Sequence, residues 1–384
     1  MDISLLIFII VGIVWTIGWY LLRNKKKDSL VLYPFVLGIK TAKANGIFER
    51  IGKKIPRKTD LVIQVIAAVL GIIGISILTW NALLIFIKPQ DSSSIVPLIP
   101  GVTIPFSTSL LFILVGIGIA LVGHEMAHGA IISREKVPIR SSGIFIAGVL
   151  GGGFVEPDED VFNKIPERSK RTILAAGSVS NLAIGVATLG LVLLATLVMP
   201  LFYGPPAGVY ISNTVPGSPA DGKIPTPSLL VAINNTPIRT YEDLSGYLDN
   251  VLPGEVVVMT IVSLENPSSI NVTLVTGESP TNSSHAYIGI SGLATYYPQK
   301  YPMILVDYIT FTYILRLLVW IYVININVAI VNMVPIPLFD GMRFFESILK
   351  NRKISNVIGG ICLTILLINV IGSGVIHGWR LPLW

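Results

Sequence analysis

The feature that most constrains this chain is a series of apolar segments, each long enough to cross a lipid bilayer. Six occur, at about 3–22, 61–87, 106–133, 171–200, 304–334 and 355–376. Only 13% of the residues are charged, against about a quarter in soluble domains, so the chain lacks the side chains that cover a water-facing surface. We expect a polytopic α-helical membrane protein with about six transmembrane helices, the first retained as a span, in the lipid bilayer of the cell membrane.

Basic residues are concentrated in the segments that follow the first, third and fifth spans. Eleven Lys and Arg residues lie between Arg23 and Lys58, whereas the stretch 201–303 holds three. Because Lys and Arg favour cytoplasmic loops, this pattern assigns the basic segments to the cytoplasm and the stretch 201–303 to the outside. The same distribution accounts for the net charge of +6, and we expect no nucleic-acid partner.

Composition divides the chain into four regions. They are the first span with a basic cytoplasmic connector at 1–60, two parts of a membrane core at 61–200 and 304–384, and an intervening region at 205–298. The intervening region contains short alternating apolar runs, Gly208–Ile211, Ser228–Ile233 and Val256–Ser263, which are separated by turn signals such as Pro253-Gly254. We expect one small extramembrane β-rich domain there, with a helix over Tyr241–Asn250 that Thr240 caps.

The stretch from Ile144 to Phe154 is apolar and rich in glycine, but it is too short for a helical span. Beside a spanning helix, such a run is either a membrane re-entrant loop or a plain cytoplasmic loop. A re-entrant backbone is tolerated where it is buried in protein or lines a cavity. The residues alone leave both interpretations open.

The third span ends in the sequence His124-Glu125-Met126-Ala127-His128. On a helix the two histidines lie one turn apart on the same face, where their imidazoles can bind one zinc ion. Glu125 can take a proton from metal-bound water and return it to the leaving amine. Ionisable residues in an apolar span are costly without a partner, so the pattern predicts a metal site rather than an incidental cluster.

A catalytic zinc site needs a third protein ligand. The remaining histidines, His285 and His377, fall on the opposite side of the membrane in this topology, so we expect a carboxylate. The fifth span ends in the sequence NMVPIPLFDG, which begins at Asn332; its two prolines break the helix, and broken backbone at membrane depth usually lines a cavity. Asp340 is therefore a candidate ligand, although locally it is equally well interpreted as a turn residue before glycine.

The two motifs together resemble the site-2 protease family of intramembrane zinc metalloproteases. The segment GSVSN at 177–181 is similar to that family's Gly-x-x-x-Asn element, although Ser178 stands where the family often has proline. The resemblance implies a re-entrant β-loop over 143–154 and a set of roles: His124, His128 and Asp340 bind one zinc ion, Glu125 is the general base, and Asn181 holds the substrate backbone or the developing oxyanion. By its chemistry alone, Asn181 is also a small polar residue that can stabilise helix packing.

The region 205–298 is similar to bacterial PDZ domains in the segments Gly208–Ile211, Val215–Ala220 and Ile233–Ile238. The site-2 protease family often carries such an insertion ahead of the span with the Asp-Gly motif. PDZ folds bind an extended peptide or a free C-terminus by strand addition. A size filter or spacer without a ligand is the alternative interpretation.

The resemblance implies a zinc metalloendopeptidase that cuts membrane-protein substrates within a transmembrane segment, in regulated intramembrane proteolysis, with its active site towards the cytoplasm. A substrate helix must unwind first, because its carbonyl groups are held in intrahelical bonds. We expect the extended segment to be bound by the glycine- and proline-rich elements, at Gly151, Gly152, Gly153, Asn332, Pro335 and Pro337.

Two alternatives remain. A prenyl-protein-type membrane zinc peptidase also carries His-Glu-x-x-His in a span but takes its third ligand from a downstream glutamate, for which Glu346 is the candidate. A metal-handling transporter would use the histidines as a passage site. The sequence shows no internal repeat, which disfavours the transporter.

Overall fold

The computed structural model describes residues 12–13, 15–21, 30–33, 36–40, 45–99, 103–104, 108–147, 150–264, 268–279, 284–301 and 307–379. Five helices within these ranges are long and apolar enough to span a bilayer, namely Arg57–Ile87, Ser109–Arg134, Glu167–Phe202, Tyr308–Val331 and Arg352–His377. They coincide with the second to sixth expected spans. Of the first expected span, only residues 12–13 and 15–21 are described, and they are helical; the rest lies outside the described residues.

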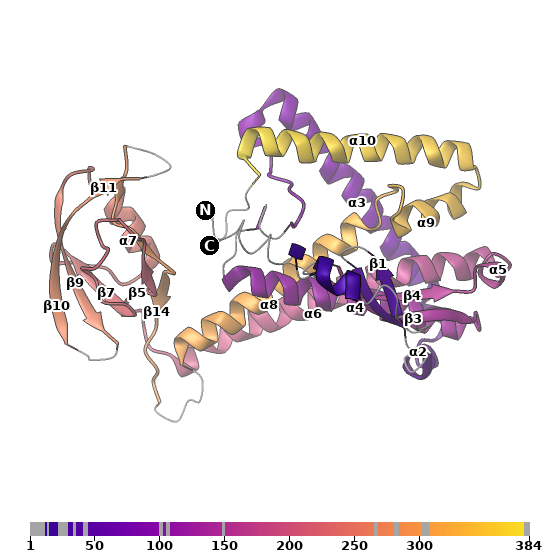
Figure 1. The fold of residues 1–384 in the computed structure, drawn as a ribbon, viewed down its shortest axis with the longest axis horizontal. Coiled ribbons are helices and arrows are strands. Elements are labelled where there is room, and N and C mark those ends of the chain that lie inside the picture. Colours follow the sequence, from indigo (N-terminus) through magenta and orange to yellow (C-terminus); the bar gives the residue numbers. More distant parts are fainter. Residues whose placement is uncertain are drawn as a thin grey trace. The chain divides into compact units, whose positions relative to one another are not determined.

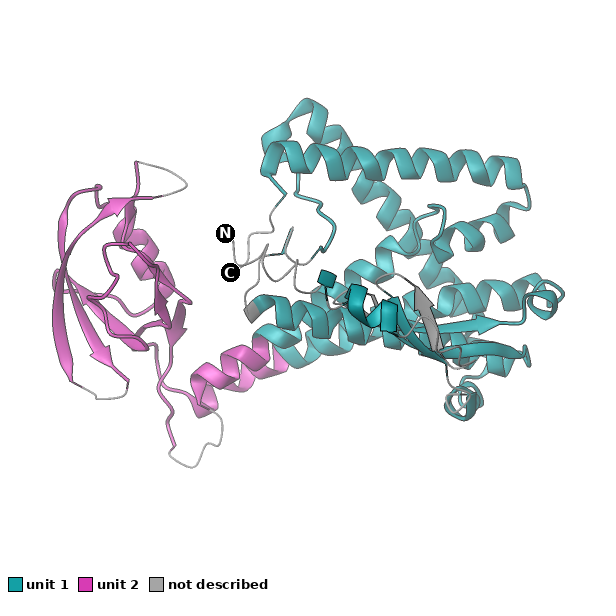
Figure 2. Cartoon of the chain, in the orientation of Figure 1, with its two compact units in different colours: residues 1–192, 316–384 teal, residues 193–315 magenta. Residues whose placement is uncertain are grey.

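The chain divides into two compact units, residues 1–192 with 316–384 and residues 193–315 (Figure 2). The first unit contains β1 (Leu30–Tyr33), β2 (Val36–Lys40), α2 (Asn45–Gly52), α3 (Asp60–Ile87), α4 (Thr108–Arg134), β3 (Ile139–Ala147), β4 (Leu150–Pro157), α5 (Glu159–Phe162), α9 (Asp340–Leu349) and α10 (Arg352–His377). Short 3-10 turns, Arg57–Thr59 and Pro89–Asp91, flank α3. Most of α6 (Glu167–Phe202) and α8 (Tyr308–Val331) also belongs to this unit (Figure 1).

The helices of the first unit present large apolar side chains outward. Trp80, Phe86 and Val375 are 65%, 72% and 78% exposed. Contiguous apolar surface is a liability in water, but hydrocarbon is its natural surrounding in a bilayer. The protein is thus a polytopic helical membrane protein, as the apolar segments predict.

The glycine-rich stretch contributes to two paired strands, and its glycines at 151–153 lie in the second of them. Strands β3 and β4 pair antiparallel, and β2 pairs with β3, giving a four-stranded sheet in the order β1-β2-β3-β4. Residues 143–147 and 150–154 are therefore paired strands of a sheet rather than a plain loop. The pairing with 36–40 was not predicted; a run of apolar, β-branched and aromatic residues at 30–39 was the available signal.

Strand β4 packs closely against the motif helix α4. A Cβ at Gly152 would lie 2.9 Å from Leu121 Cδ1, and one at Gly153 would lie 3.6 Å from Glu125 Cβ. A Cβ at Gly152 would displace the end of the Leu121 side chain, whereas one at Gly153 would make ordinary van der Waals contact with Glu125. The glycines thus lie in an edge strand whose backbone comes close to the helix that carries both histidines.

A buried ion cluster fixes the C-terminal end of α4. Arg134 lies 2.8 Å from the Asp60 carboxylate on α3 and 3.0 Å from Glu135, and all three side chains are less than 10% exposed. Glu135 also accepts a hydrogen bond from Ser169 Oγ on α6. Removing one partner of a buried ion pair strongly destabilises a protein, because the other charge is left buried and unpaired. The cluster therefore holds α3, α4 and α6 in one arrangement beside the motif.

The second unit contains the expected β-rich domain. Its elements are β5 (Gly208–Ile211), β6 (Asn213–Thr214), β7 (Ser228–Ile233), β8 (Thr236–Pro237), α7 (Tyr241–Leu248), β9 (Val256–Ser263), β10 (Ser269–Val275), β11 (Gly277–Glu278), β12 (Ala286–Tyr287), β13 (Ile290–Ser291) and β14 (Ala294–Tyr296). The main sheet has the order β10-β9-β7-β5-β14, with β8 beside β7. Helix α7 begins where the sequence predicts, with a capping box between Thr240 and Asp243.

Candidate metal centre

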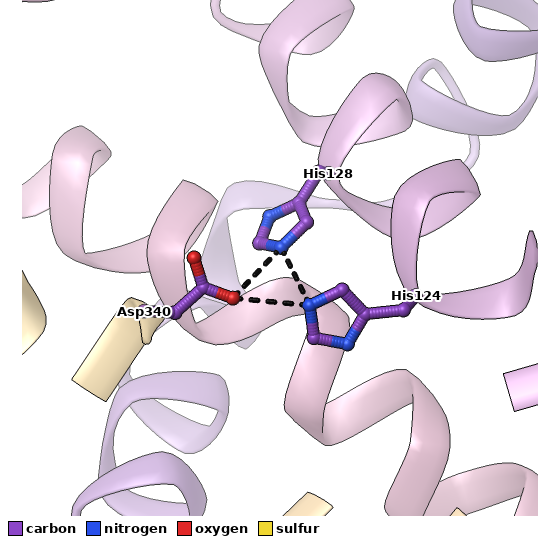
Figure 3. Close-up of side chains that lie close together, drawn as sticks. All are labelled: His124, His128 and Asp340. Atoms are coloured by element: carbon purple, nitrogen blue, oxygen red, sulfur yellow. Dashed lines mark hydrogen bonds and ion pairs between the residues drawn. The ribbon is translucent and has the colours of Figure 1, made fainter. Parts of the chain in front are cut away.

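The two motif histidines point their Nε2 atoms at one another. His124 and His128 lie one turn apart on α4, both less than 10% exposed, with their Nε2 atoms 3.0 Å apart (Figure 3). Nδ1 of His128 lies 2.7 Å from the carbonyl oxygen of Ile173 on α6. That carbonyl can only accept, so Nδ1 of His128 carries a proton, and in the neutral imidazole Nε2 has the lone pair that a metal needs.

The third member of the group arrives from the break after α8. The helix ends at Val331, and the chain turns through Pro335 and Pro337 before α9 begins at Asp340. Oδ2 of Asp340 lies 3.0 Å from His124 Nε2 and 3.1 Å from His128 Nε2 (Figure 3). The return is fixed by a backbone hydrogen bond from Gly341 to the Asn332 carbonyl, at 2.9 Å.

The three atoms fit a zinc ion. Two neutral nitrogens and one carboxylate oxygen form a typical catalytic donor set, and they leave a fourth tetrahedral position open. Ligands about 2.0–2.1 Å from zinc stand roughly 3.3 Å apart in a tetrahedron, close to the separations observed here. Two buried imidazole nitrogens and a half-buried carboxylate oxygen at such distances require a cation or protons between them. The described residues contain one such group of potential metal ligands, and Glu346 is not part of it.

Glu125 lies outside this triangle, on the side of the strand. Its Oε2 accepts a hydrogen bond of 3.0 Å from the backbone N–H of Val155 in β4. Since β4 ends the strand order of its sheet, this contact uses the edge that no other described strand covers. The carboxylate is thereby held next to both the histidines and an unpaired strand edge.

Two asparagine amides contact the candidate ligands. Nδ2 of Asn332 donates to Asp340 Oδ2 at 2.8 Å and lies 3.1 Å from His124 Nε2. The amide of Asn181, which is fully buried on α6, lies 3.3 Å from Nδ1 of His124. A methyl group at Gly177, one turn before Asn181, would clash with the His124 ring. The segment 177–181 therefore packs directly against the first histidine.

The comparisons with known proteins follow this geometry. The sequence profile of Peptidase family M50 matches residues 112–372, which is more than half of the chain and includes every residue named in this centre. The chain belongs to Peptidase family M50. This is the site-2 protease family of zinc-dependent membrane metallopeptidases, so the resemblance drawn from the two motifs is confirmed.

Two individual proteins are also similar to this chain, and neither assigns it a function. An uncharacterised protein of Methanocaldococcus jannaschii is 25% identical over 365 residues, covering 92% of this chain and 88% of its own length. A solution structure of a protein from Geobacillus thermodenitrificans is 25% identical over 21% of this chain and 88% of its own, with a TM-score of 0.19.

The residues predicted to bind substrate are divided in the structure. Gly151, Gly152 and Gly153 lie in β4, whereas Asn332 contacts Asp340 and so belongs to the metal centre of this M50 peptidase. Pro335 is buried and Pro337 exposed in the turn between α8 and α9. Sequence reasoning missed the contacts of Val155 with Glu125 and of Ile173 with His128, because backbone groups leave no mark on residue identity.

Proposed function

We propose that this membrane metalloprotease is a zinc endopeptidase that hydrolyses peptide bonds within transmembrane segments of other membrane proteins. The observation that carries the proposal is the convergence of His124 and His128, on a helix long and apolar enough to span a bilayer, with Asp340 at the start of α9, beside Glu125. A hydrolytic site on spanning helices is most directly reached by a substrate that also lies in the membrane.

The residues divide the chemistry between them. When bound by His124, His128 and Asp340, zinc supplies Lewis-acid polarisation and lowers the pKa of water. Glu125 takes the proton of the attacking water and passes it to the leaving amine. Asn332 holds Asp340 in position, and Asn181 holds His124 or supports the developing oxyanion.

The free edge of β4 supports binding of an extended substrate. In the Gly151–Gly153 segment, alternate backbone groups face away from β3, next to Glu125. A substrate strand added to this edge would have its carbonyl groups freed from intrahelical bonds and presented to the site. Pro335 and Pro337 would border the same extended segment on the side of Asp340.

The β-rich domain is proposed to be a PDZ-like module on the outside of the membrane, with the active site towards the cytoplasm. The distribution of basic residues supports this orientation. The domain would bind a peptide or a free C-terminus, or exclude substrates whose ectodomains have not been trimmed. Trimmed single-span proteins would then be cut in regulated intramembrane proteolysis.

The test is the zinc content of the purified full chain and of three variants. About one zinc per chain is expected in the unsubstituted protein, with depletion in His128→Ala and in Asp340→Ala. His285→Ala, which removes an exposed histidine of the β-rich domain, is the matched control and should retain zinc. Full zinc in Asp340→Ala would reject the proposed ligand set and return Glu346 and the prenyl-protein type to consideration.

Activity is measured on the same proteins in proteoliposomes with single-span peptides. Cleavage within the span supports the proposal. Cleavage only of a C-terminally prenylated peptide would favour the prenyl-protein type. Zinc flux without any proteolysis would favour a metal-handling transporter.

A further inference from the structure

A small apolar pocket opens beside Glu125, separate from the three candidate ligands. Its volume is about 140 Å³, and it lies between α2, α4 and the β3–β4 hairpin. Phe48 forms one wall from α2, Val122 and Met126 come from α4, and Phe154 comes from β4. Among the described residues that line it, Glu125 alone is ionisable.

The position of the pocket relates it to the substrate backbone. Val155, whose N–H binds Glu125, lines the pocket, and so does Gly153 on the same strand edge. A peptide lying along this edge next to Glu125 would have alternate side chains pointing to the two faces of the sheet. One of those side chains, close to the bond under attack, would then be directed at the pocket.

The chemistry of the pocket defines what it accepts. A cavity of about 150 Å³ lined by aliphatic and aromatic residues holds a benzene molecule, so a volume near 140 Å³ suits a leucine or phenylalanine side chain. An indole is larger, and a charged group would be buried without a partner beside the Glu125 carboxylate.

The pocket rim is open to surfaces that a membrane substrate would approach. Val122 and Ile144, two of its lining residues, are 41% and 61% exposed. Both lie on the outer surface of the unit that carries the spanning helices. A transmembrane segment rich in leucine and phenylalanine would therefore meet an apolar entrance.

We propose that this pocket is a specificity subsite that receives a leucine- or phenylalanine-sized side chain from one of the two residues flanking the scissile bond. The inference rests on the proposed function, because it assumes that a peptide is cut beside Glu125. It adds the substrate side chain that the enzyme selects and the residues that select it.

Met126 sets the depth of the subsite. It also lines a larger apolar cavity of about 380 Å³, formed with Gly123, Ala127 and Ala130 on α4 and with residues of α2, α3 and α6. Shortening Met126 would join the two spaces. Met126→Ala is therefore expected to admit tryptophan, whereas Val122→Trp is expected to fill the pocket from its exposed rim.

The experiment uses the full chain in proteoliposomes and a panel of single-span peptides. After the cut is mapped by mass spectrometry, each flanking residue is varied in turn through Gly, Ala, Leu, Phe and Trp. At one flanking position, the unsubstituted enzyme should prefer Leu or Phe to Gly by at least about ten-fold in kcat/KM. Val122→Trp should lower kcat/KM for the Leu and Phe peptides relative to the Ala peptide, so that the preference is lost.

Val115→Trp is the matched control, because Val115 is 39% exposed and lies two turns earlier on the same face of α4, outside the pocket. It should leave the preference intact. A flat preference at both positions, or equal losses on all peptides in Val122→Trp alone, would overturn the subsite while leaving the proposed function standing. No cleavage of any peptide by the unsubstituted enzyme would instead reject the proposed function, and the subsite with it.

Discussion

The candidate metal centre and the core of the β-rich domain are assembled over very different lengths of chain. Two of the candidate ligands, His124 and Asp340, are separated by 216 residues. Every buried residue of the domain core lies between Val209 and Ile288. The domain can therefore be specified by one contiguous segment, whereas the centre exists only when α4, α6 and the turn before α9 pack together.

The ends of the inserted domain agree with this contrast. Gly204 N–H donates to the Pro298 carbonyl at 2.7 Å, and Lys300 N–H donates to the Phe202 carbonyl at 2.9 Å. The chain thus enters and leaves the domain at one point. Because its two ends lie close together, the inserted domain can differ in length or sequence without altering the distance between the segments on either side.

The largest expected effect separates chemistry from metal binding within the centre. Glu125→Gln keeps an acceptor for the Val155 N–H but removes the base, so proteolysis should fall by about 10²–10⁴. Zinc content should remain near one per chain, because Glu125 is not among the three candidate ligands. Zinc analysis and a peptide-cleavage assay on the same protein sample measure the metal content and the proteolytic rate. Loss of zinc in Glu125→Gln would show that the carboxylate holds the metal rather than the proton.

A smaller effect tests whether the centre depends on residues that do not bind metal. Asn181→Ala removes the amide beside His124 Nδ1 and should weaken zinc binding by about 10–100-fold, measured by chelator competition. Asn325→Ala is the control, because Asn325 is also fully buried, on α8, and its amide donates to the Ile321 carbonyl. Unchanged zinc affinity with a lowered kcat in Asn181→Ala would favour the oxyanion role instead.

Removal of the domain tests its independence from the centre. Deleting 205–298 and joining the ends with a short linker should leave zinc content unchanged, because none of the candidate ligands lies in that segment. Peptides with long ectodomains should be cut several-fold faster than by the full chain if the domain excludes them. Unchanged length selection would refute the filter, and loss of zinc would show that the candidate centre depends on the domain.

The smallest effect is confined to the domain. Thr240→Ala removes the cap of α7 and should lower the free energy of unfolding of the domain by about 1 kcal/mol. The pKa of Asp243 in the same capping box is lowered by hydrogen bonds from the backbone N–H groups of Arg239 and Thr240. Its stabilising contribution is therefore present above the ordinary carboxyl pKa and is lost as the pH falls below it. Hydrogen exchange of the α7 amides at neutral and acidic pH measures the loss of the cap and the pH dependence of the Asp243 contribution. The zinc content of Thr240→Ala should not change.

The sequence alone determined the features whose information is local. Five spans, the strands at Gly208–Ile211, Ser228–Ile233 and Val256–Ser263, and the cap at Thr240 all follow from hydropathy, alternation or capping chemistry within a few residues. The pairing of His124 with His128 could also be predicted from the sequence alone, because helical periodicity places them on one face. The two motifs together were sufficient to indicate the family.

Only the tertiary structure decided the features that depend on distant segments. It joined Asp340 to the histidines, resolving an aspartate that locally was equally well a turn residue. It also paired 36–40 with β3, the partner of the glycine-rich strand β4, and brought the Val155 amide to Glu125. Strand pairing and backbone contacts depend on main-chain groups that every residue shares, so residue identity does not encode them directly. Those contacts arise only once the packing of α4 against α6 and β4 has fixed the distances.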